Sequence, residues 1–408
     1  MDSNVQSSTA GAEARNRAHL IVSPFFIVLA ASILYYAPVL VLQAYHYDLF
    51  GLYRTGLKLQ NPWLSHGVVV LVVLFLLGTA KAKFRAVFKP TVARSDFLFW
   101  GLFCVYTCMA LVSMMVLVTE LELLSLANDM FFDPIQFALK LAMIGVKLGE
   151  GGLLKFYLMI HFLPVLWFLW CSNTRPGRWV FVRKAVLYAS FGLIFFFFVL
   201  LTRRELIIYL MLILLIGFGG KVKKTYIFSI LALVGLTSVY LVSMRLGDVD
   251  FSPELYFTSE EFYPFQLSLV LIDEWVSQPY MKSLMQITPA VLLTDMPTVI
   301  SPSIMSRYFN HTGPGPTVGL PYAVTAFGVL YPCLYILTNF LFLNQIRVMV
   351  SRYAANARLI PLYAFLLLKL FLLVRNGEFF NHFLDSMLFV TLYLPFIFVT
   401  PRTQHGTA

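Results

Sequence analysis

Charged side chains are scarce in this sequence. Asp, Glu, Lys and Arg make up 12% of its 408 residues, whereas an ordinary soluble domain carries roughly twice that share. The hydrophobic residue types make up 59%. Because so few side chains are suited to face water, the composition excludes a set of soluble domains and indicates that lipid is the solvent for most of the chain.

Cysteine is scarce as well, and familiar cofactor motifs are missing. The four cysteines lie in or beside apolar runs without His partners, and we interpret them as packing residues: Cys104, Cys108, Cys171 and Cys333. The sequence contains no GxxxxGKS/T, HExxH or CxxC pattern, so it predicts no cofactor and no metal. The D-x-D triplet of Asp248 and Asp250 reads as the start of a solvated loop, with a metal site as the alternative.

Long hydrophobic runs, by contrast, are abundant. A membrane-spanning helix needs about 20 predominantly apolar residues. Ten segments are candidates: residues 20–43, 63–80, 97–119, 152–171, 185–202, 205–220, 225–243, 318–343, 359–374 and 383–399. The predicted fold class is therefore all-α, a polytopic membrane helix bundle. Only Thr202, Arg203 and Arg204 separate the fifth and sixth spans, which predicts either a tight helical hairpin or one broken helix.

The spans divide the chain into five parts. These are a polar, disordered tail, the first seven spans, a large loop with short amphipathic helices, the last three spans and a second tail, at residues 1–18, 19–243, 244–317, 318–400 and 401–408. Lys140 and Lys147 are seven residues apart in the apolar segment 134–150 and so share one helix face. This pattern predicts a helix that lies in the membrane interface.

Lysine and arginine are unevenly distributed between alternate loops. They concentrate in one set, which includes residues 81–94, 175–184 and 221–224. By the positive-inside rule this set is cytoplasmic, so both termini lie inside and the large loop lies on the outer side. The formal net charge of +10 is then a signal of orientation and not of nucleic-acid binding.

Several arginines remain on the outer side, where the positive-inside rule disfavours them. They are Arg203, Arg204, Arg245, Arg307 and Arg375. Each has a plain explanation, because helix-end arginines reach lipid headgroups and Arg203 could pair with Glu205. As a set, however, their planar and permanently charged guanidinium groups suit a diphosphate. We therefore predict that they bind a lipid-linked diphosphate.

The large loop contains candidates for a general base. His311 is the candidate base, because histidine exchanges protons near neutral pH, and Glu261 is the alternative base. Four further acids compete for this role: Glu260, Asp273, Glu274 and Asp295. His161 and His382 lie within or beside spans, where we expect them to bond between helices.

The order of four short motifs resembles the Wzy-type O-antigen polymerases, within the larger group of integral-membrane glycan polymerases and ligases. The stretch LLTRRELIIYLMLILL resembles an arginine at a periplasmic turn before an apolar helix, and VSMRLGD resembles the arginine that opens the large loop. HTGPGPTVGLPYAVTAFGVL resembles the exit of that loop, and LLVRNGEF resembles an Arg-x-Gly near the last helices. The resemblance covers most of the chain as topology.

The resemblance implies an inverting glycosyltransferase of the bacterial inner membrane with its active site facing the periplasm. Such an enzyme joins oligosaccharide repeat units carried on undecaprenyl diphosphate into a surface polysaccharide, without nucleotide or metal. Its partners would be the lipid-linked oligosaccharide, the bilayer and a polysaccharide chain-length regulator, and no nucleic acid. Two alternatives stay open: an O-antigen ligase that transfers glycan to lipid A-core, and a flippase for the lipid-linked unit.

Overall fold

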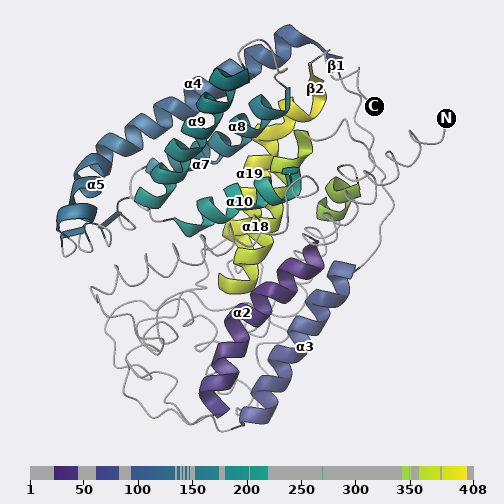
Figure 1. Cartoon of the computed structure of the whole chain (residues 1–408). Coiled ribbons are helices and arrows are strands. Elements are labelled where there is room, and N and C mark those ends of the chain that lie inside the picture. Colours follow the sequence, from purple (N-terminus) through teal and green to yellow (C-terminus); the bar gives the residue numbers. More distant parts are fainter. Residues whose placement is uncertain are drawn as a thin grey trace.

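A computed structural model gives the fold of this chain. It describes residues 23–44, 61–81, 93–133, 152–173, 180–201, 203–218, 342–348, 358–376 and 379–401, with single positions at 136, 137, 140, 143, 144, 147, 269 and 350. Helices dominate the described residues (Figure 1). In chain order the elements are α2 (Pro24–Ala44), α3 (Pro62–Lys81), β1 (Ala93–Arg94), α4 (Asp96–Glu120), α5 (Leu123–Phe132), α7 (Leu153–Ile160), α8 (Phe162–Asn173), α9 (Val180–Leu200), α10 (Arg204–Phe218), α18 (Ile360–Asn376), α19 (Phe379–Phe398) and β2 (Val399–Thr400).

The apolar runs form helices suited to a membrane. In the described part of the chain, four are long and apolar enough to cross one: Pro62–Ala80, Asp96–Glu120, Leu153–Asn173 and Phe181–Leu200. Shorter apolar helices occupy Pro24–Ala37, Glu205–Gly217 and Leu384–Phe398. The prediction of a helical protein is confirmed, and these helices have the length and composition that a membrane span needs. The large loop and the spans predicted at 225–243 and 318–343 lie outside the described residues, apart from Leu269, Phe342 and Leu343.

The fourth predicted span is interrupted near its middle. α7 ends at Ile160, His161 forms a turn, and α8 begins at Phe162. Pro164 explains the break, because a proline has no N–H to donate to the carbonyl four residues earlier and its ring clashes with that carbonyl. The His161 N–H bonds instead to the Leu158 carbonyl three residues back, at 3.3 Å.

The fifth and sixth predicted spans form a hairpin and not one broken helix. α9 ends at Leu200 and α10 begins at Arg204. The two helices pack against each other, and the chain reverses direction between them (Figure 1). The structure therefore has the tight hairpin, one of the two arrangements that the sequence predicts.

A short strand pair is a feature that the all-α prediction did not include. β1 and β2 are parallel, with Ala93 opposite Val399 and Arg94 opposite Thr400. The Ser95 N–H donates to the Thr400 carbonyl at 3.0 Å, and the Ser95 hydroxyl caps α4 by accepting the N–H of Leu98 at 3.3 Å. We call this end of the bundle the strand end. The opposite end, where α7 begins and α9 turns into α10, is the hairpin end.

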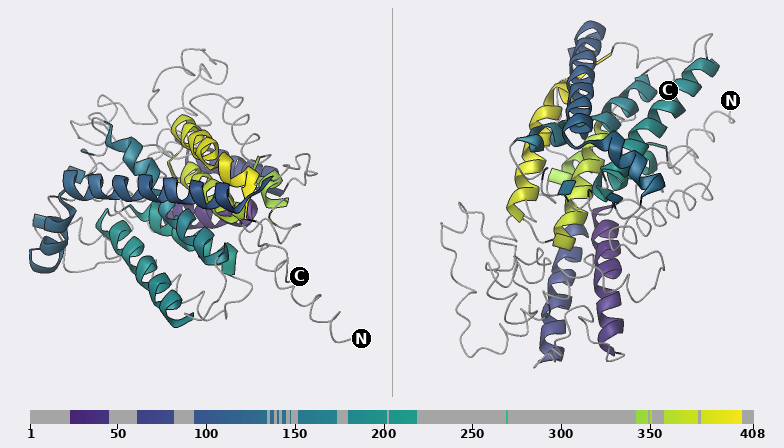
Figure 2. Two further views of the ribbon diagram at one scale, coloured as in Figure 1. Left: turned by 90° about the horizontal axis from the view of Figure 1, so that it is seen from above. Right: turned by 90° about the vertical axis from the view of Figure 1, so that its left-hand side faces the viewer.

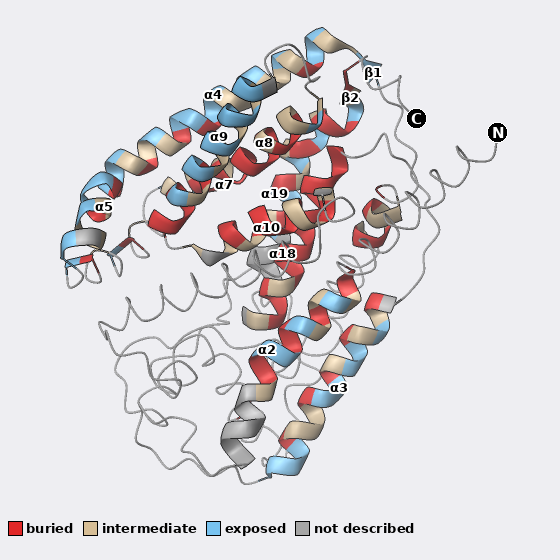
Figure 3. Cartoon of the chain, in the orientation of Figure 1, coloured by how far each residue is buried: buried red, intermediate tan, exposed pale blue. Residues whose placement is uncertain are grey.

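α18 forms the centre of the bundle. It packs against α2, α10 and α19, and all its residues from 360 to 370 are buried (Figure 3). α4 lies on the outside and buries only a narrow stripe that includes Phe99 and Leu117, whereas Met115 is 65% exposed. α2 and α3 form a pair that extends away from the other helices and joins them through α18 (Figure 2). Such exposed apolar faces suit lipid contact.

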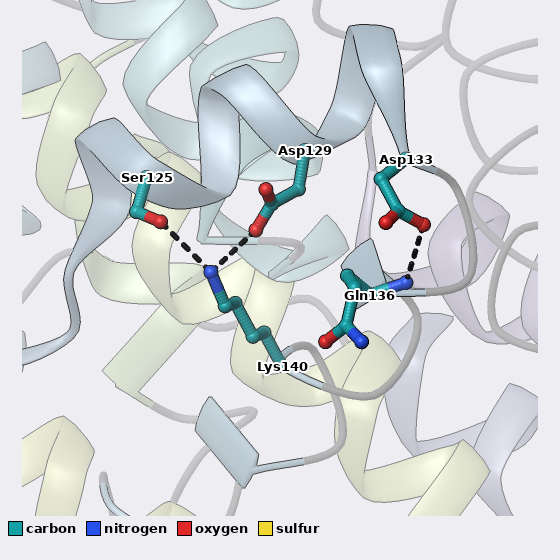
Figure 4. Close-up of polar contacts among 5 residues, drawn as sticks. All are labelled: Ser125, Asp129, Asp133, Gln136 and Lys140. Carbon is teal, nitrogen blue, oxygen red and sulfur yellow. Dashed lines mark hydrogen bonds and ion pairs between the residues drawn. The ribbon is translucent and has the colours of Figure 1, made fainter.

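The segment predicted as an interfacial helix is tied to α5. Its described positions from 136 to 147 are helical, and Asp133 starts this helix by accepting the N–H of Gln136 at 3.1 Å. The Lys140 ammonium donates to Asp129 at 2.5 Å and to the Ser125 hydroxyl at 2.8 Å (Figure 4). Lys140 therefore anchors this segment to α5, a helix that the sequence pattern did not single out.

Candidate functional site

Two of the predicted outer arginines lie at the same end of the bundle. Arg203 immediately precedes α10, and Arg375 is in the last turn of α18. The Tyr209 hydroxyl of α10 donates to the Pro361 carbonyl at the start of α18 at 3.2 Å. Glu205, one turn earlier in α10, lies instead in the electrostatic field of Lys369, further along α18. The two helices are therefore antiparallel, and both arginines lie toward the hairpin end.

Arg203 lies over an aromatic ring from another helix. Its guanidinium carbon is 5.8 Å from the ring centroid of Tyr157 in α7, within the range of a cation–π contact. The Tyr157 hydroxyl donates to the Glu205 carboxylate, in the first turn of α10. Among the described residues, no carboxylate approaches the Arg203 guanidinium to ion-pair distance. Arg203 thus keeps its N–H donors for a further acceptor.

A buried ion pair lies beside these residues. The Lys369 ammonium of α18 is 2.5 Å from the Asp385 carboxylate of α19, and the side chain of Lys369 is only 8% exposed. The Glu205 carboxylate lies within the electrostatic field of both Lys369 and Arg203. Among the described residues, two cations and two carboxylates therefore lie within a site that four helices build. Charges this deep among apolar helices are costly, and in membrane proteins they mark functional sites.

His161 lies at the break between α7 and α8 and borders the same site. It is 2% exposed, and its Nδ1 is 3.0 Å from the carbonyl oxygen of Tyr157. Since a carbonyl only accepts, Nδ1 must carry the proton of this bond. The ring packs against Tyr209 and Phe365. We expected His161 to bond between helices, but this bond stays within its own segment.

Arg375 repeats the geometry of Arg203. Its guanidinium carbon is 5.8 Å from the ring centroid of Tyr35 in α2. That ring packs against Phe371, one turn before Arg375, at a centroid distance of 5.8 Å. Each of the two arginines is therefore placed against a tyrosine of a different helix.

The side chain of Arg183, at the strand end, is placed differently. The Arg183 guanidinium donates to the Cys171 carbonyl at the end of α8, at 3.2 Å, which satisfies one of the open carbonyls of that helix end. Arg358 precedes α18 and is only 4% exposed, and its carbonyl accepts the Tyr393 hydroxyl. These contacts join helices of the bundle to one another.

The structure brings together only part of the predicted site. Arg204 begins α10, and its side chain is outside the described part of the chain, as are Arg245, Arg307, His311 and Glu261. Sequence reasoning passed over Tyr157, Lys369 and Asp385, which the fold places beside Arg203. An ionisable residue inside an apolar span is the signal that could have found Lys369 and Asp385.

The description of the site rests on the chain's own residues. Among the described residues, no group of three or more His, Cys, Asp or Glu side chains is placed to hold a metal ion. Comparisons with family models, curated proteins and solved structures find no match to the chain. The functional interpretation therefore depends on the residues of the site.

Proposed function

We propose that this chain is an integral-membrane glycan polymerase of the O-antigen type. It joins oligosaccharide repeat units carried on undecaprenyl diphosphate. The observation that carries the proposal is the placement of Arg203 and Arg375, two guanidinium groups at one end of a membrane helix bundle, each against a tyrosine ring. The order of sequence motifs around these two arginines supports the same family.

The chemistry of the reaction accounts for the arginines. The anomeric carbon of the donor glycan is attacked by a hydroxyl of the acceptor unit, the glycosidic bond to the lipid diphosphate breaks, and the configuration inverts. The leaving diphosphate gains negative charge, and one close cation contributes about 4 kcal/mol at an effective dielectric near 20. No carboxylate of the described residues pairs with Arg203, so its guanidinium can hold this charge. In this proposal Arg204, Arg245, Arg307 and Arg375 complete the anion site.

The proton of the attacking hydroxyl requires a base. His311 is our candidate and Glu261 the alternative, both in the large loop that we place over the hairpin end. No cofactor takes part, because the diphosphate linkage already supplies the driving force. The proposed setting is the bacterial inner membrane, with ten spans, both termini cytoplasmic and the hairpin end facing the periplasm.

A deletion strain tests the proposal. Removing the gene from the producing bacterium should leave lipid A-core carrying a single repeat unit, and a plasmid copy should restore the ladder of longer glycans on a gel. Loss of even the single-unit band would mean that the chain is the ligase. A full ladder in the deletion strain would contradict both assignments.

The buried charges favour a second candidate, a flippase for the same lipid-linked unit. The Lys369–Asp385 pair lies among apolar helices, and such pairs line substrate paths in transporters. Reconstituted protein would then move fluorescent undecaprenyl diphosphate across a vesicle bilayer without lengthening any glycan. A polymerase lengthens lipid-linked units in detergent, where no second compartment exists.

A further inference from the structure

The ring beneath Arg203 is itself held in place. Tyr157 is 8% exposed, whereas Arg203 is half-buried, so the ring backs the guanidinium from the interior of the bundle. The Tyr157 hydroxyl is bonded to the Glu205 carboxylate, which prevents the ring from tilting away. A ring fixed at its hydroxyl offers the guanidinium one face in one orientation.

An ion pair lies near Glu205. Its carboxylate lies in the field of Lys369, and Lys369 is bound to Asp385 at 2.5 Å. The chain of contacts runs from α7 through α10 and α18 to α19.

From this geometry we infer that Tyr157 and Glu205 are positioning residues that hold the Arg203 guanidinium in place for a diphosphate. The inference rests on the proposed function and adds two residues that act through Arg203. The ring fixes the plane of the guanidinium, so that its N–H donors point in set directions before the ligand arrives. An arginine ordered in advance loses less side-chain entropy on binding.

The second arginine supports the inference independently. Arg375 lies over Tyr35 at the same 5.8 Å distance, although both residues come from other helices. A ring behind the guanidinium is thus shared by both of the outer arginines whose side chains are described. At the strand end, Arg183 donates to a backbone carbonyl.

The test measures binding of undecaprenyl diphosphate to the purified full-length chain in detergent by microscale thermophoresis. Arg203→Ala should abolish measurable binding. Tyr157→Leu, which removes the ring, should weaken binding about tenfold. Tyr157→Phe, which keeps the ring and loses its hydrogen bond, should weaken it about threefold. Glu205→Gln keeps an acceptor for the hydroxyl and should bind like wild type, whereas Glu205→Leu should bind like Tyr157→Phe.

Tyr106→Phe is the matched control. The Tyr106 hydroxyl donates to the Leu392 carbonyl at 2.7 Å and joins α4 to α19 outside the site. This variant should lose stability without losing affinity. If Tyr106→Phe weakens binding as much as Tyr157→Phe, or if Tyr157→Leu binds like wild type while Arg203→Ala does not, the inference is wrong. Wild-type binding by Arg203→Ala overturns the proposed site itself.

A second ligand separates recognition of the diphosphate from recognition of the lipid. Inorganic pyrophosphate is used to displace undecaprenyl diphosphate from wild type and from Tyr157→Leu. If Tyr157 acts through Arg203, the substitution weakens both ligands in the same proportion. If it weakens only the lipid ligand, Tyr157 contacts the prenyl chain and is no positioning residue.

Discussion

The two ends of the helix bundle use arginine in opposite ways. At the strand end, Arg183 donates to the Cys171 carbonyl. At the hairpin end, Arg203 and Arg375 lie against tyrosine rings, and Arg203 has no carboxylate at ion-pair distance among the described residues. An arginine bonded to a helix terminus stabilises the fold, whereas we propose that Arg203 binds a ligand, because the described residues supply no carboxylate to pair with it.

The two ends also differ in the interactions that hold their helices together. The hairpin half of the bundle holds Lys369, Asp385 and Glu205 in one network. The strand end relies on the strand pair, on Ser95 as a helix cap and on close packing of α8 against α10. Substitutions chosen in pairs, one at each end, separate binding from stability.

The largest effect is expected from Lys369→Met. It leaves the Asp385 carboxylate without its paired cation inside the bundle, which should cost about 3–5 kcal/mol of folding free energy. Thermal unfolding in detergent, followed by tryptophan fluorescence, measures the loss. The double variant Lys369→Met with Asp385→Leu should recover part of it. Unfolding of Lys369→Met at the wild-type temperature would show that the pair carries no such role.

Arg203→Ala and Arg183→Ala compare the two kinds of arginine directly. Loss of one oxyanion donor typically lowers turnover about 100-fold, so Arg203→Ala should reduce the glycan ladder in the producing strain to single repeat units. Arg183→Ala should leave the ladder intact and lower the unfolding temperature. The reverse pattern would mean that the ligand binds at the strand end.

Gly217→Ala tests the packing of the strand end. A Cβ at Gly217 would lie 2.5 Å from Cε2 of Phe168, in α8. Because buried rings on packed helices yield little, we expect a loss of about 1–3 kcal/mol. Gly101→Ala in α4, where a Cβ meets nothing within 4 Å, is the control and should not destabilise. Equal stability of both variants would show that α8 and α10 are not in close contact.

The smallest effect is expected from Tyr106→Phe. Its hydroxyl donates one hydrogen bond to the Leu392 carbonyl at 2.7 Å, worth about 1 kcal/mol net. The unfolding temperature should fall slightly and the glycan ladder should not change. A shortened ladder would connect the α4–α19 contact to catalysis, which is not expected.

Much of the helical architecture follows from the sequence, because apolar runs of spanning length leave the backbone no alternative to helix in lipid. The apolar stretches that contain Phe99 and Leu193 both became helices. The break at His161 was not predicted, although Pro164, three residues later, is a signal for it. The strand pair at Arg94 and Thr400 carried no such signal, because two-residue strands leave no alternating pattern.

The candidate site was only partly foreseeable. Arg203 and Arg375 were identified from their position outside the cytoplasmic loops, which depends on sequence alone. Tyr157 was not, because a tyrosine near a helix end is common and its partner Glu205 is 48 positions away. Lys369 and Asp385 were also passed over, although both are charges within an apolar span, and only the packing of α18 against α19 shows that they pair.

Turnover by the purified protein tests the central claim most directly. Wild type and Arg203→Ala are incubated in detergent with the lipid-linked repeat unit of the producing strain, without nucleotide, and the glycans are sized after release from the lipid. We predict that wild type forms chains of two or more repeat units and that Arg203→Ala forms almost none. Unchanged single units with wild-type protein, or equal chain growth by both proteins, would contradict a polymerase that relies on this arginine.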